Sequence, residues 1–175
     1  MKRIMWLIPA ILLLSLTARA QEAPQFEISG GYSFLDANLN SSSFHLNGGN
    51  AALGENLNSW FGGRFEFNAY GGSVANTNIS AQTFSFGPVF TYRHFDRLAP
   101  FGFFELGGMH ASQGYLGISA SATKLAMSFG GGVDYKLRDR IAVRVQGNYM
   151  WTDFLALRQN NIQLQAGVVF QIGKI

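Results

Sequence analysis

Two residues in the middle of the chain, His110 and Ser112, are of the types that carry out hydrolysis. They are two positions apart in HASQG, so on an extended strand both would lie on the same face. A nucleophilic serine needs a histidine as its base and an acid that orients the histidine, all joined by hydrogen bonds. Glu105 falls on the opposite face by alternation, and no convincing third member is evident. We therefore expect polar residues at a strand end, with catalysis as the alternative.

Other common kinds of site are poorly matched by this sequence. The chain has no cysteine, and His45, His94 and His110 are far apart, without the spacing of metal ligands. The run Gly130-Gly131-Gly132 lies inside a predicted strand and does not begin a helix, so it is not expected to bind phosphate. The sequence predicts neither a metal site nor a cofactor.

Charged residues within the predicted strands form a stronger candidate site. Eight of them share the polar faces by alternation: Glu27, Arg64, Glu66, Arg93, Glu105, Asp134, Lys136 and Arg144. Burying any of these four acids and four bases without a partner would be costly, so we expect them to pair with one another. Such pairing requires strands that surround a common interior, or lumen.

The segment Leu125–Trp151 shows what elements would position these charges. Ile141–Trp151 alternates apolar with polar residues, and Leu125–Lys136 alternates around several glycines. The stretch 138–140 between them is too short for a crossover, so the two strands must be antiparallel. Long hairpins with one apolar face and one polar, Gly-rich face are typical of barrels in membranes.

Similar alternation along the chain predicts eight strands in all. They are Gln25–Leu35, Phe44–Leu53, Ser59–Gly71, Gln82–Arg93, Phe101–Ser112, Leu125–Lys136, Ile141–Trp151 and Ile162–Ile172. Polar stretches predict loops at Asp36–Ser42, Gly72–Ala81, Gln113–Ala122 and Phe154–Asn160. We also expect a bulge or a kink at Gly48-Gly49 and an irregularity at Pro88. In the fifth strand we place Phe104 outward and Phe103 and Glu105 inward.

Residues 1–20 are a different kind of sequence. Lys2 and Arg3 precede an apolar run, and Ala18-Arg19-Ala20 places small residues where a signal peptidase cleaves. This pattern predicts a secretory signal peptide, with residues 21–175 as the barrel domain. Three of the 13 Lys and Arg lie in the leader, so the mature chain has as many basic residues as its 10 acidic ones. No basic stripe remains that would bind nucleic acid.

The composition points to a membrane. Charged residues are 13% of the chain, about half the roughly 25% of soluble domains. After residue 20, no apolar run approaches the roughly 18 residues of a spanning helix. Such a chain enters lipid only as a closed barrel. The predicted fold class is therefore an all-β, eight-stranded, antiparallel, up-and-down transmembrane β-barrel with both termini on one side.

Aromatic residues gather near the ends of the predicted strands, where their rings would lie at the level of the lipid headgroups. Tyr70 and Phe101 also fall near strand ends and are assigned to the same two belts. The main members of the predicted girdles are Phe26, Trp60, Tyr92, Tyr135, Tyr149, Trp151 and Phe170.

Three motifs give the mature chain a resemblance to a known family along its whole length. GGGVDYKLRDRIAVRV at the last short turn, FFELGGM in the fifth strand and FEF in the third resemble the outer-membrane protein A/X superfamily of eight-stranded barrels. The resemblance is to members that consist of the barrel alone, and no peptidoglycan-binding domain is inferred. It implies an outer-membrane barrel inserted by the barrel assembly machinery. In one departure from the family, QIGKI follows Phe170 where an aromatic end is common.

In the family that the chain resembles, interior pairs of carboxylates and arginines hold the barrel shut or gate a narrow path. Glu66, Asp134 and Arg144 match such positions, while Val89 stands where the family has a lysine. Eight strands leave an interior just wide enough for side chains, which excludes a wide pore. A structural plug is favoured, and a narrow gated path remains the alternative.

The hypothesis is a non-enzymatic, structural or porin-like barrel in the outer membrane of a Gram-negative-type bacterium. Its role would be envelope integrity, surface interaction or restricted passage of small solutes. We expect contacts with outer-membrane lipid and lipopolysaccharide, none with nucleic acid, and a monomer. One alternative resembles the lipid A deacylases, which use a His-x-Ser arrangement on a small barrel. Another is a soluble exported barrel that binds an apolar ligand, which the stripe of Phe84, Phe86 and Phe90 argues against.

Overall fold

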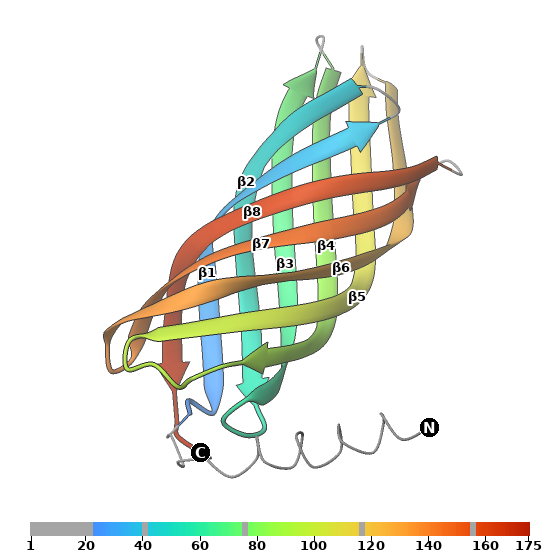
Figure 1. Ribbon diagram of the computed structural model, residues 1–175. Helices are drawn as coiled ribbons and strands as arrows, with labels where there is room; N and C mark the ends of the chain where they lie inside the picture. Colours follow the sequence, from blue (N-terminus) through green and yellow to red (C-terminus); the bar gives the residue numbers. More distant parts are fainter. Residues whose placement is uncertain (1–22, 40–41, 75–76, 116–117, 155–156) are drawn as a thin grey trace, which may run out of the picture.

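The computed structural model describes residues 23–39, 42–74, 77–115, 118–154 and 157–175. They form a closed barrel in which each strand pairs antiparallel with the next and the last pairs with the first (Figure 1). The strands are β1 (Phe26–Leu39), β2 (Ser42–Asn56), β3 (Phe61–Val74), β4 (Thr77–Thr91), β5 (Leu98–Tyr115), β6 (Ile118–Arg138), β7 (Ile141–Phe154) and β8 (Leu157–Ile172). The predicted eight-stranded antiparallel barrel is confirmed. The predicted leader, residues 1–20, lies outside the described residues.

The two ends of the barrel differ. At one end, residues 57–60 join β2 to β3, residues 92–97 join β4 to β5, and residues 139–140 join β6 to β7. The start of β1 and the end of β8 lie at this same end (Figure 1), which we call the turn end. The opposite end carries the hairpins β1–β2, β3–β4, β5–β6 and β7–β8, and we call it the hairpin end. None of the described residues forms a helix that could cross a membrane.

Successive side chains alternate between the lumen and the outer surface, as the period of two predicted. In β4, Phe86 is 63% exposed on the outer wall, whereas Thr83 is 4% exposed in the lumen. The same rule resolves β5, whose two faces are both apolar in part. Phe104 is exposed, while Phe103 and Glu105 are buried, as expected.

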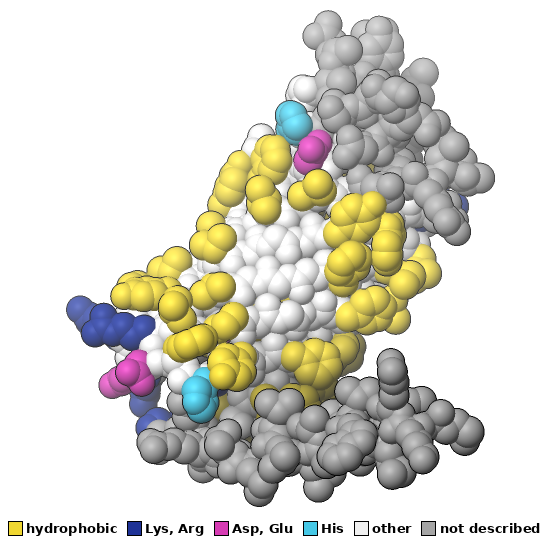
Figure 2. All heavy atoms as spheres, in the orientation of Figure 1, with side chains coloured by type: hydrophobic (Ala, Val, Ile, Leu, Met, Phe, Trp, Pro, Cys, Tyr) yellow, Lys and Arg dark blue, Asp and Glu magenta, His cyan; other side chains and the backbone are white. Residues whose placement is uncertain are grey.

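The outer wall of the barrel is apolar. Figure 2 shows hydrophobic side chains spread over the wall on the face drawn, with charged side chains towards the ends. Every strand contributes large exposed apolar residues, among them Ile28, Leu53, Phe65, Phe86, Leu106, Phe129, Val145 and Leu164. Water-soluble monomers rarely expose apolar surface on this scale, so the wall fits the hydrocarbon of a bilayer.

The strands reach further towards the hairpin end than alternation predicted. Asp36 pairs with His45 across β1 and β2, and Ser73 pairs with Asn78 across β3 and β4. Strand pairing does not require an apolar face, so polar composition alone could not distinguish these strand ends from loops. The described residues of the predicted loops are therefore strand, and the prediction was wrong for them. The loops were predicted over Asp36–Ser42, Gly72–Ala81, Gln113–Ala122 and Phe154–Asn160, of which residues 40–41, 75–76, 116–117 and 155–156 lie outside the described residues.

Two local predictions had opposite outcomes. The prediction of a bulge at Gly48-Gly49 was wrong, because strand pairing runs through both residues without a shift of register. Gly48 permits a close approach instead, since a Cβ there would lie 1.9 Å from the carbonyl oxygen of Ala69. The irregularity expected at Pro88 is confirmed, because the pairing of β4 with β5 is interrupted at Gly87 and Pro88.

The lumen changes character along its length. Towards the hairpin end it is filled by an apolar cluster of Leu35, Ala37, Leu46, Tyr70, Ala81, Met109, Ala126 and Met150. Nearer the turn end, the buried side chains include carboxylates, arginines and amides. A narrow eight-stranded barrel is filled by its own side chains, so packing closes one part of this lumen and polar contacts close the other.

We predict that Gly107→Ala destabilises the barrel and that Gly102→Ala in the same strand does not. A Cβ at Gly107 would lie 1.8 Å from the carbonyl oxygen of Phe84, whereas at Gly102 the nearest atom is 3.7 Å away. Overpacking against fixed backbone costs about 1–3 kcal/mol. Urea unfolding of the refolded variants in lipid vesicles measures the difference. Equal free energies of unfolding would contradict the close approach of β4 and β5.

Candidate functional site

Side chains from distant parts of the chain meet in the lumen close to the turn end. Arg144 donates from Nε to Oδ1 of Asp134 at 2.7 Å and from Nη2 to Oδ2 at 2.7 Å. The two residues face each other across the β6–β7 ladder, which allows this bidentate pair. Nη2 of Arg144 also donates to Oε2 of Glu27, on β1, at 2.8 Å. All three side chains are buried, where charge-assisted bonds of this kind are strongest.

A second arginine, Arg93, completes this group of charges. It follows β4 and donates from Nη2 to Oε1 of Glu27 at 3.0 Å and to Oδ1 of Asn56 at 3.1 Å. Its Nη1 donates to the backbone carbonyl of Ser59 at 2.6 Å. Glu27 therefore carries one arginine on each carboxylate oxygen. We call this balanced group the turn-end layer: Glu27, Arg93, Asp134 and Arg144.

A further charged group lies deeper in the lumen and centres on Arg64. Its Nε donates to Oε1 of Glu105 at 2.8 Å, and its Nη2 lies 3.3 Å from Oε2 of Glu66. Gly87 of β4 pairs with Arg64, and because it has no side chain the backbone of β5 at Phe104 and Glu105 can approach it closely. The guanidinium also lies 4.2 Å from the ring centroid of Phe103, a cation–π contact. We call Arg64, Glu66 and Glu105 the middle layer.

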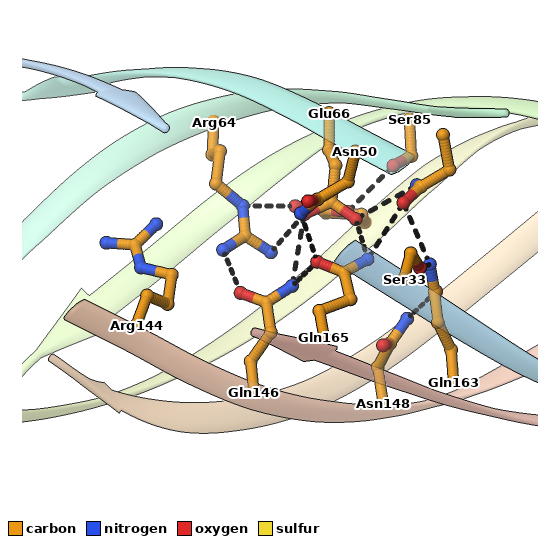
Figure 3. Close-up of polar contacts among 12 residues, drawn as sticks. Ser33, Asn50, Arg64, Glu66, Ser85, Arg144, Gln146, Asn148, Gln163 and Gln165 are labelled. Carbon is orange, nitrogen blue, oxygen red and sulfur yellow. Dashed lines mark hydrogen bonds and ion pairs between the residues drawn. The ribbon is translucent and has the colours of Figure 1, made fainter. Parts of the chain in front are cut away.

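Uncharged amides join the middle layer to the opposite wall. Glu66 accepts hydrogen bonds from Asn68 at 3.0 Å, Gln165 at 2.8 Å and Gln146 at 3.1 Å. Oε1 of Gln146 accepts a bond from Nη1 of Arg64 at 3.0 Å. Figure 3 shows Arg64, Glu66, Gln146 and Gln165 pointing towards one another from different strands. The amides were not among the predicted site residues; their signal in the sequence is their place on the inward face.

Beyond the middle layer, amides and hydroxyls lead to the apolar cluster. Nε2 of Gln163 lies within hydrogen-bond distance of three oxygens, Oγ of Ser33 at 3.1 Å, Oδ1 of Asn68 at 3.0 Å and the hydroxyl of Tyr70, which share its two hydrogens. Asn148 donates to Oε1 of Gln163 at 2.6 Å. Tyr70 is buried in the lumen, so its assignment to a lipid-facing girdle was wrong. Tyr70 is an even number of residues from Arg64 and Glu66 on β3, so its side chain lies on the same inward face as theirs.

Two cavities adjoin these layers, and they differ greatly in size. The cavity beside Arg144, Gln146 and Gln165 measures about 10 Å³, which is room for at most one water molecule. A larger cavity of about 370 Å³ opens at the turn end, lined by residues that include Arg93, Asp134 and Lys136. This outer cavity is a vestibule, and the turn-end layer lies at its base.

One member of the predicted charge network lies outside it. Lys136 is half-exposed at the rim of the vestibule, and its Nζ is 3.7 Å from Oδ1 of Asp139 in the β6–β7 turn. Because β6 ends at Arg138, the long lysine side chain reaches water instead of the lumen. The structure brings the other predicted charges into the two layers: Glu27, Arg64, Glu66, Arg93, Glu105, Asp134 and Arg144.

Aromatic residues of the predicted girdles lie on the outer surface. Six of them are exposed: Phe26, Trp60, Tyr92, Tyr135, Trp151 and Phe170. Tyr149 packs against the rings of Phe129 and Trp151 at centroid distances of 5.7 and 5.4 Å. Their position at the headgroups stays a prediction. The assignment of Phe101 to a girdle was wrong, because it is buried in the lumen with the Arg144 guanidinium 4.6 Å from its ring centroid.

His110 and Ser112 lie on one face of β5, as their spacing predicted, but each has a separate partner. Nδ1 of His110 is 2.8 Å from Oγ1 of Thr123, and Oγ of Ser112 is 2.7 Å from Oγ of Ser80. Within the described part of the chain, no hydrogen bond or ion pair joins either residue to a carboxylate. Nor do the described ranges bring together three His, Asp or Glu residues that could hold a metal ion.

Comparisons with known proteins agree with this architecture. A sequence model of the family described as "Outer membrane protein beta-barrel domain" matches residues 7–170. Neisserial surface protein A is similar in structure, with a TM-score of 0.76 and 13% identity, over 87% of this chain and 100% of that chain. Ail, the attachment invasion locus protein of Yersinia pestis, has a TM-score of 0.60 and 18% identity, over 85% of this chain and 99% of that chain. The outer membrane protein OprG from Pseudomonas aeruginosa has a TM-score of 0.54 and 12% identity, over 88% of this chain and 98% of that chain. No curated protein sequence matches the chain.

We predict that Arg144→Ala lowers the free energy of unfolding by about 3–5 kcal/mol, because it leaves buried carboxylates without their shared partner. Lys136→Ala is the matched control: it also removes a predicted lumen cation, but one at the exposed rim, and stability should not change. Urea unfolding in lipid vesicles, followed by tryptophan fluorescence, measures both variants. Equal losses would show that the buried contacts of Arg144 do not stabilise the barrel.

Proposed function

The chain belongs to the family of outer-membrane proteins with a β-barrel domain, and on this premise we propose that it is a non-enzymatic barrel with a closed lumen. Its role would be structural, in the integrity of the envelope, with the hairpin end available for contacts at the surface. The lumen side chains would act as a plug.

The contacts of Arg64 carry this proposal. From β3 its guanidinium contacts Glu105 on β5 and Gln146 on β7, while Gln146 in turn donates to Gln165 on β8 at 2.7 Å. Hydrogen bonds thus cross the interior from wall to wall, and a solute moving along the barrel axis would have to break several of them. The apolar cluster would have to be displaced as well.

The proposal extends to the cellular setting. We propose that residues 1–20 direct export in a Gram-negative-type bacterium, and that the barrel assembly machinery inserts the mature chain as a monomer. The short connections of the turn end would face the periplasm, and the hairpin end would face outward among lipopolysaccharide. The aromatic girdles would then lie at the two headgroup levels.

We predict that the refolded protein shows no discrete single-channel openings in planar bilayers at neutral pH. Arg144→Ala should also be silent, because the middle layer and the apolar cluster remain in place. Correct folding of each sample is checked by its heat-dependent mobility in gel electrophoresis. Openings in the wild type would overturn the closed-barrel proposal; openings in Arg144→Ala alone would make the turn-end layer the gate.

We also predict that expressing the protein leaves the acyl content of lipopolysaccharide unchanged, because neither His110 nor Ser112 contacts an orienting acid in the described residues. Mass spectrometry of lipid A from cells with wild type, His110→Ala or no protein tests this. A loss of acyl chains that requires His110 would identify a lipid-modifying enzyme instead.

A further inference from the structure

The charges buried in the lumen are unequal in number. The turn-end layer contains two carboxylates and two guanidiniums, so it is balanced. In the middle layer, Arg64 alone serves both Glu66 and Glu105. Lys136 cannot supply the missing positive charge, because it lies at the rim beside Asp139. One carboxylate in the middle layer is therefore in excess.

Among the residues that the structure describes, no further cation lies beside the middle layer. Glu105 is 1% exposed and Glu66 is 2% exposed, so water cannot solvate an extra negative charge there. The charged groups that face Glu105 are Arg64 and Glu66 of β3. The neighbouring strands contribute neutral side chains to this level, namely Ser85 of β4, Ser128 of β6 and Gln146 of β7. An unpaired buried charge is very unfavourable, and a bound proton removes it.

The hydrogen bonds distinguish the two carboxylates. Glu66 accepts bonds from three amide groups, and its Oε2 also lies 3.3 Å from Nη2 of Arg64. The groups around Glu66 donate hydrogen bonds through N–H groups, which cannot accept a hydrogen bond. An ionised carboxylate, which only accepts hydrogen bonds, matches such surroundings. Glu105 has only one such donor, Nε of Arg64 on Oε1. Its other oxygen, Oε2, lies 2.7 Å from the hydroxyl of Ser85, which can accept a hydrogen bond as well as donate one.

We propose that Glu105 is a proton-binding site and holds its proton on Oε2 at neutral pH, donating it to Oγ of Ser85. Glu66 is then ionised and paired with Arg64, and the charges of the turn-end layer and the middle layer are all matched. Gly87 supports this site, because a Cβ there would lie 2.8 Å from Cα of Glu105, so its missing side chain lets β5 approach β4 closely.

The site makes closure of the lumen dependent on pH. When the pH rises, the proton leaves Oε2 of Glu105 for water. Glu105 then carries an excess negative charge beside Arg64 and Glu66. The neutral acid therefore stabilises the closed lumen most at low pH, and this contribution declines as the pH rises and is lost when Glu105 ionises. This consequence rests on the proposed closed barrel, whereas the proton itself rests on the geometry of the middle layer.

Infrared spectroscopy of the refolded protein in lipid bilayers tests the site, with glutamate labelled by ¹³C to separate it from aspartate. At neutral pH we expect one carbonyl band from a protonated glutamic acid, which disappears as the pH is raised. Glu105→Gln should abolish the band, and Glu55→Gln, at an exposed glutamate, should leave it unchanged. Ser85→Ala should shift the band, because it removes the acceptor of the proposed hydrogen bond.

Absence of the band at neutral pH would overturn the proposal, as would a band that persists in Glu105→Gln. If Glu105→Gln does not fold, Ser85→Ala decides, since an unshifted band would place the proton elsewhere. Single-channel recording of the same samples separates this test from the proposed function. Openings at neutral pH would refute the closed barrel and leave the infrared band as the measure of the proton site.

Discussion

The pairing of β1 with β8 is the constraint on which the rest of this structure depends. Hydrocarbon offers no partner to a backbone N–H or C=O, so a sheet can cross a bilayer only if no edge strand is left. Closure gives each strand two neighbours, and each side chain must then face either lipid or lumen. The exposed ring of Phe86 and the buried carboxylate of Glu105 are consequences of the same closure.

A closed sheet of eight strands leaves a lumen too narrow for bulk water. Charged side chains placed there must find partners among other side chains, and they do so at two levels. In the turn-end layer, Arg144 bridges Asp134 and Glu27; in the middle layer, Arg64 bridges Glu66 and Glu105. Amides extend these contacts to the far wall, and apolar packing takes over towards the hairpin end. Side chains therefore fill the lumen at several levels along the barrel axis, and the filling does not depend on a single ion pair.

The fold of the family accounts for the wall of this barrel, and the lumen holds its buried charges. Resemblance in sequence pointed to Glu66, Asp134 and Arg144 as interior charges, and all three are buried in the two layers. What the structure adds is their arrangement: a balanced layer near the turn end and a middle layer with one carboxylate in excess. The position of Val89, where the resembled family has a lysine, fits a lumen with fewer cations than acids.

Alternation with a period of two is a property of one strand, so the sequence by itself determined the number of strands, a short turn around Asp139 and the outward face of Phe104. It could not determine where strands end, because polar segments such as Gly72–Ala81 pair without an apolar face. Nor could it decide which charges meet. Arg64 and Glu105 are 41 residues apart, and Glu27 and Arg144 are 117 apart. Their contacts, and the exclusion of Lys136, depend on the register between strands and on closure, which only the tertiary structure sets.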